Sequence, residues 1–374
     1  MDEELNEQSR IICAIIGCGN ISDIYIKNLK RFPIIELKYC SDIITEKAVE
    51  KAEKYNLKYY SLSEIYNDSN DIQLIVNLTN PSSHFEVSLR AIESGKHVYS
   101  EKPLTTTYKD AKLLVEKAKE KRLYIGCAPD TFFGSPWQTS KKLIEEKWIG
   151  NPISATAFML CRGHESWHPS PEFYYQRGGG PLFDMGPYYL TTLVFLLGPI
   201  EEVFAYGKTT FNKRTITSKD KFGSPISVEV LTHITALIKF EKNVLCTMIM
   251  SFDTWGHKLP YIEIYGEYGS LSLPDPNCFN GPISYYNQYN QKWIEFPTYY
   301  DIFENLRGIG VADMVKGILK KGEFRANSEV ALHILEVMEK ILESAERGKS
   351  LNIETSCKSP SLIKETDYPV TLPS

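Results

Sequence analysis

The sequence lacks the features that mark several large classes of protein. It contains no run of the roughly 20 apolar residues that a membrane-spanning helix needs. It has no block of lysine and arginine, and its formal net charge is −5, so nucleic acid is not an expected partner. The first ten residues are acidic and polar, unlike the apolar core of a secretory signal. We therefore expect a cytoplasmic protein that binds neither nucleic acid nor membranes.

Cysteine motifs for metal binding and redox chemistry are also absent. The chain has eight cysteines, and no two of them have the C-x-x-C spacing of zinc or redox sites. Several lie inside apolar runs, which is typical of reduced, buried thiols. The spacing of His164, Glu165 and His168 would suit a metal, but we expect none.

The first third of the chain alternates short apolar runs with helical patterns. Strands are predicted at 11–16, 35–40, 58–60, 72–78, 97–100 and 123–126. Such alternation predicts right-handed βαβ units and a parallel sheet. We assign residues 1–128 to an α/β Rossmann domain that binds a dinucleotide.

A glycine turn joins the first predicted strand to the first predicted helix. Gly17 would allow the tight turn, and Gly19 would let the backbone approach a pyrophosphate at the helix N-terminus. Ser22 holds the third glycine position of the fingerprint and is small enough for close packing. The alternative is a purely structural turn.

Asp42 ends the second predicted strand, about twenty residues after the glycines, where an acidic residue can accept hydrogen bonds from the ribose hydroxyls. A carboxylate there also repels a 2′-phosphate, which favours NAD over NADP. The alternative is that Asp42 caps the helix beginning near Thr45.

The predicted strand at 97–100 leads into Glu101, Lys102 and Pro103. Ligands of open α/β sheets bind outside the carboxyl ends of the strands, so Lys102 is a candidate catalytic group. Read alone, the stretch favours a solvated loop lysine, and the rest of the chain reverses that preference.

After residue 126 the pattern changes to long strands rich in β-branched and aromatic residues. These strands are predicted at 153–160, 200–206, 226–240, 244–252, 261–266 and 269–273. We assign residues 129–350 to an α+β domain with a large, mostly antiparallel open sheet, and residues 351–374 to an extended C-terminal tail.

A glycine run precedes a helical pattern in this second domain. Asp184 and Tyr188 are four residues apart and therefore share one face of that helix. The alternative makes Asp184 a first-turn acid near the helix dipole and Tyr188 a core aromatic.

The loop at 162–169 contains two histidines, a tryptophan and an arginine. This composition is typical of loops that bind sugars through an aromatic face and hydrogen-bond donors. The candidate substrate-binding residues are Asp130, His164, Trp167, His168, Arg177 and His257, and Trp255 and Arg307 could also face the cleft. Each of them could instead serve packing or the surface.

Taken in order, four motifs resemble those of the Gfo/Idh/MocA family, which includes glucose–fructose oxidoreductase and inositol dehydrogenase. The motifs are Gly17-x-Gly19-Asn20-Ile21, Asn80-Pro81-x-x-His84, Gly95-Lys96-His97-Val98 and Glu101-Lys102-Pro103. The resemblance implies that the named residues of the first and second motifs bind the cofactor, together with Glu101 and Lys102 of the fourth. It also implies that Glu101 and Lys102 flank the nicotinamide, with Lys102 reaching the substrate hydroxyl, and that the Lys102–Pro103 peptide bond is cis.

The resemblance extends to the second domain. Asp184 matches the family's second motif, while Tyr188 stands where many members have histidine and where glucose–fructose oxidoreductase has tyrosine. The family also implies a homodimer or homotetramer formed through the C-terminal sheet.

The predicted function is reversible hydride transfer between NAD and a hydroxyl-bearing carbon of a sugar, cyclitol or sugar derivative. Lys102, Asp184 and Tyr188 are the predicted catalytic residues, with either Tyr188 or Lys102 accepting the proton. Lysine and tyrosine side chains both ordinarily have a pKa of about 10, so catalysis requires a shift. Two alternatives are an NAD-dependent glycosidase with no net redox change and a non-catalytic, cofactor-binding sensor or co-regulator.

Overall fold

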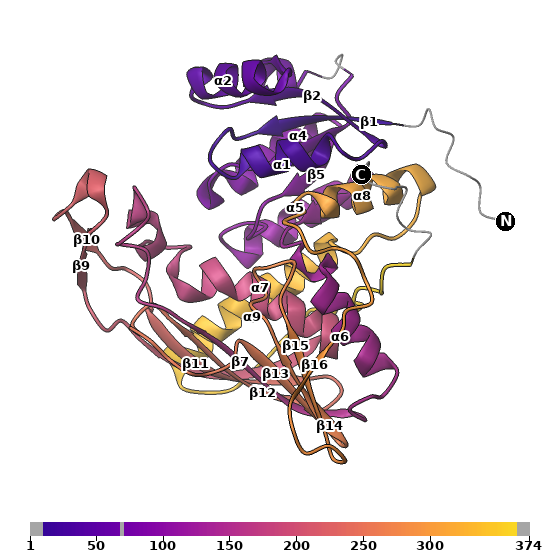
Figure 1. Ribbon diagram of the computed structural model, residues 1–374. Helices are drawn as coiled ribbons and strands as arrows, with labels where there is room; N and C mark the ends of the chain where they lie inside the picture. The colour runs from indigo at the N-terminus through magenta and orange to yellow at the C-terminus, as the bar shows by residue number, and fades with distance from the viewer. Residues whose placement is uncertain (1–9, 68–70, 365–374) are drawn as a thin grey trace. The chain divides into compact units, whose positions relative to one another are not determined.

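The computed structural model describes residues 10–67 and 71–364 (Figure 1). The chain divides into two compact units. The first takes the chain as far as Phe133, then Asn305–Leu332 and the segment from Pro360 onward; the second takes Gly134–Glu304 and His333–Ser359. Part of the predicted tail, 365–374, lies outside the described residues.

The first unit contains a six-stranded parallel sheet with the order β3-β2-β1-β4-β5-β6. Its strands are β1 (Ile11–Ile16), β2 (Ile35–Ser41), β3 (Lys58–Tyr59), β4 (Leu74–Asn77), β5 (His97–Ser100) and β6 (Ile125–Cys127). The order reverses between β1 and β4, and ligands of such sheets bind at this switch point. The predicted Rossmann fold is confirmed.

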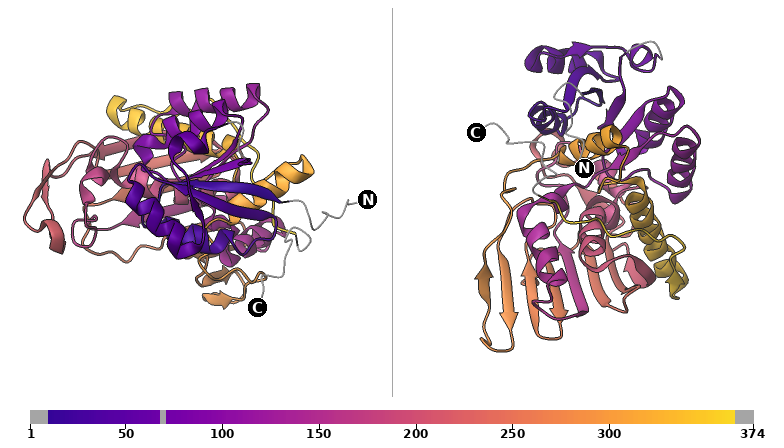
Figure 2. Two further views of the ribbon diagram at one scale, coloured as in Figure 1. Left: turned by 90° about the horizontal axis from the view of Figure 1, so that it is seen from above. Right: turned by 90° about the vertical axis from the view of Figure 1, so that its right-hand side faces the viewer.

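Helices cover both faces of this sheet (Figure 2). They are α1 (Ser22–Leu29), α2 (Thr45–Tyr55), α3 (Leu62–Ile65), α4 (His84–Glu93), α5 (Tyr108–Glu120) and α8 (Ile309–Lys320). Cys13, Ala14 and Ile15 follow one another in β1, and all three are fully buried. Because successive strand residues point to opposite faces, the sheet has no solvated side here, which explains the continuous apolar run.

The second unit contains a nine-stranded sheet with the order β16-β15-β14-β13-β7-β12-β11-β8-β17. The strands are β7 (Pro152–Leu160), β8 (Ile200–Lys208), β11 (His233–Phe240), β12 (Leu245–Ser251), β13 (Ile262–Gly266), β14 (Gly269–Leu273), β15 (Ile283–Asn287), β16 (Ile294–Phe296) and β17 (Leu351–Asn352). Only β7 and β12 pair in parallel, so the predicted mostly antiparallel sheet is confirmed.

One predicted strand, at 226–240, is divided in the structure. Residues Pro225–Ser227 form β10, which pairs with β9 (Lys213–Thr215) in a separate two-stranded sheet, and β11 begins only at His233. The helices of this part of the chain are α6 (Ser135–Glu145), α7 (Gly180–Leu197) and α9 (Ser328–Arg347).

Helix α7 is buried along almost its whole length, because it packs on β7, β11 and β12. On the opposite face of the sheet Tyr206, Leu237 and Leu245 are more than half exposed. Alternation along β11 accounts for this difference, since Ile234, Ala236 and Ile238 point to the helix side and are buried.

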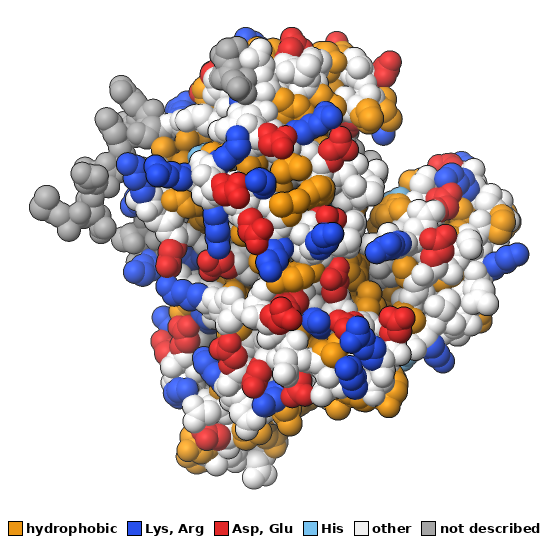
Figure 3. Space-filling view, turned by 180° about the vertical axis from the view of Figure 1, so that it is seen from behind, with side chains coloured by type: hydrophobic (Ala, Val, Ile, Leu, Met, Phe, Trp, Pro, Cys, Tyr) orange, Lys and Arg blue, Asp and Glu red, His pale blue; other side chains and the backbone are white. Residues whose placement is uncertain are grey.

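Within the described residues, no helix has the length and hydropathy needed to cross a bilayer. On the face shown in Figure 3, basic and acidic side chains are interspersed rather than gathered by sign.

Candidate functional site

The glycine turn between β1 and α1 is built so that its backbone is accessible. Gly17 has a φ of +102°, and a Cβ atom there would lie 2.5 Å from the main-chain carbon of Leu78, so only glycine fits. A Cβ at Gly19 would meet nothing within 4 Å. Ser22 closes the turn by donating from its hydroxyl to the Gly19 carbonyl at 2.6 Å. The open space beside Gly19 at a helix N-terminus fits a dinucleotide pyrophosphate.

Asp42 is fastened to this turn. One carboxylate oxygen accepts a hydrogen bond from the Cys18 N–H at 2.7 Å, and the other accepts from the Ile44 N–H at 2.8 Å. Residue 44, not 42, occupies the N-cap position of α2, and no side chain caps that helix. A carboxylate has about four lone-pair sites, so Asp42 keeps the capacity to accept ribose hydroxyls.

The end of β4 is organised by Asn77, a residue that sequence reasoning did not single out. Its amide nitrogen donates to the His84 carbonyl at 3.1 Å and to the Ser88 hydroxyl at 3.0 Å. Its amide oxygen accepts from both the N–H and the hydroxyl of Thr79. Asn77 is a polar residue inside an apolar run of the sequence. A buried amide must find hydrogen-bond partners, so this position could have been recognised as one that organises the neighbouring turn.

His84 joins two turns at this edge of the sheet. The ring is fully buried, with Nδ1 2.6 Å from the Pro103 carbonyl oxygen and Nε2 3.0 Å from the Thr79 carbonyl oxygen. Burial lowers the pKa of His84. Both ring nitrogens therefore face the chain itself, and His84 holds the turn after β4 against the turn after β5. Asn80 and Pro81 lie on the first of these turns.

Glu101 and Lys102 follow β5 directly. Glu101 accepts a hydrogen bond from the Tyr25 hydroxyl at 2.8 Å with one oxygen and from the Lys102 N–H at 2.9 Å with the other. The Lys102 side chain is half-buried, and the Lys102–Pro103 peptide bond is cis, as the resemblance implies. The Glu101 N–H also donates to the Asn77 carbonyl at the end of β4 at 2.8 Å, so the backbone beside Lys102 is held by contacts to both β4 and α1.

Asp130 lies inside the first unit. Its Oδ2 atom accepts from the N–H groups of Gly308 and Gly310, at 2.8 and 3.1 Å, and so secures the start of α8. Burial raises the pKa of Asp130 to about 6. These contacts give Asp130 a structural role.

In the second unit the structure joins Asp184 to His164. Asp184 lies on α7, and its Oδ2 atom is 2.9 Å from Nε2 of His164, which belongs to the loop after β7. Both side chains are nearly buried, with 14% and 12% of their surfaces exposed. The His164 ring lies against Trp167, Tyr174 and Phe252, with centroid distances of 5.1, 4.1 and 4.8 Å. Tyr188 is buried one turn further along α7.

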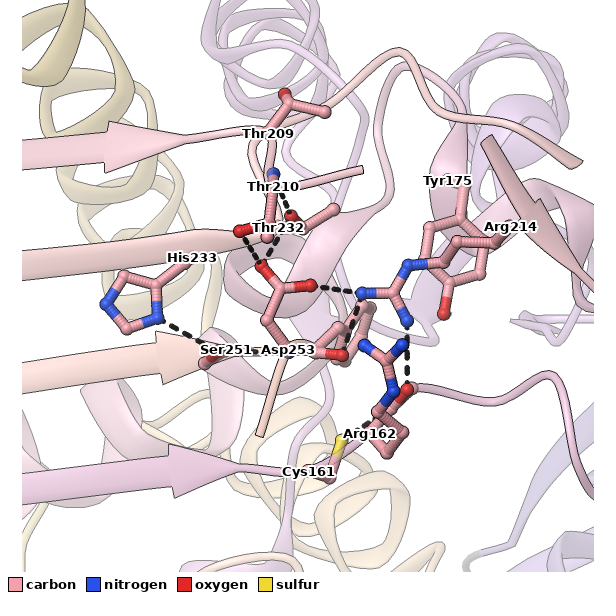
Figure 4. Close-up of polar contacts among 12 residues, drawn as sticks. Cys161, Arg162, Tyr175, Thr209, Thr210, Arg214, Thr232, His233, Ser251 and Asp253 are labelled. Carbon is pink, nitrogen blue, oxygen red and sulfur yellow. Dashed lines mark hydrogen bonds and ion pairs between the residues drawn. The ribbon is translucent and has the colours of Figure 1, made fainter. Parts of the chain in front are cut away.

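The loop that carries His164 is held by Arg214 on β9 (Figure 4). The Arg214 guanidinium donates to the Arg162 carbonyl at 2.9 Å and to the Glu165 carboxylate at 2.6 Å. These two bonds come from Nη1, and Nη2 donates to the Phe252 carbonyl and to the Asp253 carboxylate. Arg214, Glu165 and Asp253 lie far apart in the sequence and share no motif, so sequence reasoning missed this cluster.

The other predicted substrate residues are at the surface of the second unit. Trp167 is 61% exposed, and Arg177 and His257 are also exposed. His168 is partly buried, and its Nδ1 atom accepts from the Ser170 N–H at 3.0 Å. Across residues 10–67 and 71–364, no group of three or more histidine, cysteine or acidic side chains is placed to hold a metal.

Comparison with known proteins assigns both parts of the chain to one family. Residues 11–127 match the model of an oxidoreductase family with an NAD-binding Rossmann fold. Residues 137–272 match the model of the GFO/IDH/MocA C-terminal domain.

The proteins similar to this chain include oxidoreductases, some of which are named for a substrate. Oxidoreductase P35 of Formosa agariphila is 26% identical over 310 residues, which cover 78% of this chain and 89% of the relative. Myo-inositol 2-dehydrogenase of Thermotoga maritima is 28% identical over 197 residues, covering 52% of this chain and 57% of the relative. Levoglucosan dehydrogenase in complex with NADH has the same fold, with a TM-score of 0.80 at 19% identity over 92% of this chain and all of that one. The chain therefore belongs to the Gfo/Idh/MocA family of NAD-binding oxidoreductases.

Proposed function

We propose that the protein is an NAD-dependent dehydrogenase that oxidises a hydroxyl group of a sugar, a cyclitol or a related polyol, and that it also catalyses the reverse reduction. The observation that carries this proposal is the arrangement of Asp42 and Gly19 at one turn, together with Lys102 at the end of β5. The sugar and inositol dehydrogenases among its relatives support this substrate class.

The dinucleotide would lie along the carboxyl ends of β1, β2 and β4. The open backbone at Gly19 would receive the pyrophosphate, and the spare lone pairs of Asp42 would accept the ribose hydroxyls. A 2′-phosphate would bring negative charge against the Asp42 carboxylate, and we therefore propose NAD rather than NADP. When bound, NAD⁺ supplies the acceptor for the hydride that leaves the carbinol carbon.

Lys102 is proposed to contact the reacting hydroxyl, with Asp184 and Tyr188 completing the catalytic set. An ammonium group donates up to three hydrogen bonds, so Lys102 can hold the substrate oxygen while the carbonyl forms. A neighbouring positive charge also favours loss of the hydroxyl proton. Trp167, Arg177 and His257 are proposed to bind the rest of the substrate, because they combine an exposed aromatic face with polar groups.

A panel of substrates tests the function. The protein is incubated with NAD⁺ and with sugars, cyclitols and aryl glycosides, while NADH absorbance and aglycone release are followed together. NADH accumulation with at least one sugar or cyclitol is the expected result. Aglycone release without net NADH would replace the proposal with an NAD-dependent glycosidase. Tight NAD binding with neither signal would indicate a sensor.

We also propose that two or four copies associate through the open face of the nine-stranded sheet. Tyr206, Leu237 and Leu245 leave an apolar surface there that a second copy would cover. Sedimentation of the wild type and of Leu237→Glu tests this, with dissociation of the variant expected and an unchanged mass contradicting it.

A further inference from the structure

We propose that Arg162 binds a carboxylate group of the substrate, so that the preferred substrates are sugar or cyclitol acids rather than neutral polyols. The proposal rests on the dehydrogenase function above and deepens it by naming a substrate class. It starts from the Arg162 guanidinium, which lies over the rings of Phe211 and Trp255, at 5.0 and 4.8 Å from their centroids.

The Arg162 guanidinium is a cation without an acidic partner. Across residues 10–67 and 71–364, no carboxylate pairs with it and no acceptor takes a hydrogen bond from its side chain. The side chain is partly exposed, and its nitrogens are not among the buried polar atoms that lack a partner. The neighbouring rings of Trp255 and Phe211 are 85% and 43% exposed, so a ligand can reach the five N–H donors of the guanidinium.

The two acids of the adjoining cluster are bonded to Arg214 instead. The Glu165 carboxylate accepts from Arg214 at 2.6 Å. One oxygen of Asp253 also accepts from Arg214, and the other accepts from the Thr210 hydroxyl at 2.6 Å. The protein therefore neutralises Arg214 with two carboxylates and leaves Arg162 with none.

The two arginines lie close to each other. The Arg162 and Arg214 guanidinium carbons are 5.0 and 5.7 Å from the centroid of the same ring, that of Phe211. Like charges at such separations repel each other, and the repulsion is strongest where solvent is partly excluded. An anion bound to Arg162 would offset this repulsion, which a neutral hydroxyl cannot do.

The backbone around Arg162 is held in place. The Cys161 carbonyl accepts from the Thr254 N–H at 3.0 Å, which ties the loop to the residue before Trp255. The Arg162 carbonyl accepts from the Arg214 guanidinium at 2.9 Å (Figure 4). A side chain that is positioned in advance loses less conformational freedom on binding, so Arg162 is prepared to bind a ligand.

The geometry of a guanidinium favours a carboxylate over other oxygen groups. Its planar fork of N–H groups matches the two oxygens of a carboxylate, and it forms two parallel hydrogen bonds with them. Such charge-assisted bonds are roughly twice as strong as those between neutral groups. Arg162 can therefore distinguish a sugar acid from the neutral sugar of the same stereochemistry.

The position of Arg162 in the chain places it near the proposed catalytic set. Arg162 stands two residues before His164, and the His164 ring is 2.9 Å from the carboxylate of Asp184. Two residues of extended chain span at most about 7 Å. One small substrate can therefore contact Arg162 with its carboxylate while its reacting hydroxyl lies towards Asp184.

Kinetics with matched pairs of substrates provide the first test. Glucuronate and galacturonate are compared with glucose and galactose, with NADH absorbance as the readout. We expect kcat/KM of the wild type to be at least about tenfold higher for the acids, because they form charge-assisted hydrogen bonds. Arg162→Gln should raise KM for the acids by about 10- to 100-fold and leave kcat, and the kinetics of the neutral sugars, unchanged.

Two further variants serve as controls. Arg162→Lys keeps the charge but loses the fork, so its KM for the acids should lie between those of the wild type and Arg162→Gln. Arg347→Gln removes an exposed arginine on α9 that pairs with Glu343 at 2.9 Å, and its kinetics should match the wild type. A wild type that prefers the neutral sugars or glucose 6-phosphate, or an Arg162→Gln variant with an unchanged KM for the acids, would overturn the inference and leave the dehydrogenase function in place.

A second measurement does not depend on turnover. Glucuronate, galacturonate and acetate are titrated calorimetrically into the protein with NADH present, which prevents oxidation. We expect at least one uronate to bind at least about tenfold more tightly than acetate, and Arg162→Gln to lose this binding by about 10- to 100-fold. Binding of acetate as tight as that of both uronates, or no binding of either uronate, would overturn the inference. If no sugar or cyclitol yields NADH with the wild type, the proposed function fails, and the titration still decides whether Arg162 binds a sugar acid.

Discussion

Asp42 accepts a hydrogen bond of 2.7 Å from the main-chain N–H of Cys18. The residue proposed to select the cofactor therefore also holds the turn that would bind the pyrophosphate. Because the Asp42 carboxylate serves both roles, a substitution of Asp42 should change both the stability of the protein and its preference for NAD over NADP.

Replacing Asp42 with alanine should weaken NAD binding and narrow the preference for NAD over NADP. Loss of a hydrogen bond to a charged group costs about 1.5–3 kcal/mol, which corresponds to an NAD affinity lower by about 10- to 100-fold. The free energy of unfolding should also fall by about 1–3 kcal/mol, because the Cys18 N–H loses its acceptor. Fluorescence titration with both cofactors measures the preference.

The control for this prediction is Asp71→Ala. Asp71 accepts from Lys38 at 2.9 Å at another edge of the first unit. This variant should keep the wild-type ratio of NAD to NADP affinity, and an unchanged ratio in Asp42→Ala would refute the assigned role.

Two glycine substitutions should separate folding from cofactor binding. Gly17→Ala combines a positive φ with a main-chain clash at Leu78, so we expect a loss of about 2–4 kcal/mol of stability. Gly19→Ala meets nothing within 4 Å, and its stability should stay within about 0.5 kcal/mol of the wild type. The new methyl group of Gly19→Ala would occupy the space for the pyrophosphate and should still weaken NAD binding. Chemical unfolding and NAD titration of both variants check this contrast, and tight NAD binding by Gly19→Ala would contradict it.

Asp130 should make stability depend on pH in the acidic range. Its folded pKa of about 6 lies above the ordinary value of 3.8, so the folded state holds the proton more tightly. Binding of this proton stabilises the folded protein; the effect is complete below pH 3.8 and is lost as the pH rises to about 6. Asp130→Asn keeps an acceptor for Gly308 and Gly310 but does not titrate. Relative to the wild type it should gain up to about 3 kcal/mol between pH 4 and 7. If the free energies of unfolding of the wild type and of Asp130→Asn differ by the same amount at pH 4 and at pH 7, the pKa of Asp130 is not raised in the folded state.

Arg214 should act on turnover through the position of the 162–165 loop. Arg214→Lys keeps the charge but loses the planar fork that donates to the loop carbonyl, Glu165 and Asp253 together. We expect kcat to fall by at least about tenfold, with NAD affinity unchanged. Arg214→Met leaves the Glu165 and Asp253 carboxylates, which are 13% and 9% exposed, without a neighbouring cation and should lose about 3–5 kcal/mol of stability. An Arg214→Lys enzyme with wild-type kcat would show that the loop needs no such support.

The features that the sequence predicted correctly depend on residues that are close together in the chain. The order of strands and glycines in the first unit, the helix with Asp184 and Tyr188, and the mostly antiparallel second sheet all follow from periodicity and turn residues. The family resemblance rests on the same local motifs.

Pairings between distant residues could not be predicted in this way. The bond between His164 and Asp184 depends on how the loop after β7 folds over α7, and periodicity does not report that. The Arg214 cluster depends likewise on the division of the strand predicted at 226–240 into β10 and β11. Its partners lie 39 and 49 residues from Arg214 in the chain.

Substitution of Lys102 tests the proposed function most directly. Lys102→Met keeps most of the aliphatic stem and removes only the amine, and Lys109→Met, an exposed lysine on α5, is the matched control. With a substrate that gives NADH, Lys102→Met should lose kcat by about 10²–10⁴-fold and still bind NAD with wild-type affinity, while Lys109→Met stays fully active. A kcat near the wild-type value in Lys102→Met would contradict the proposed role of Lys102.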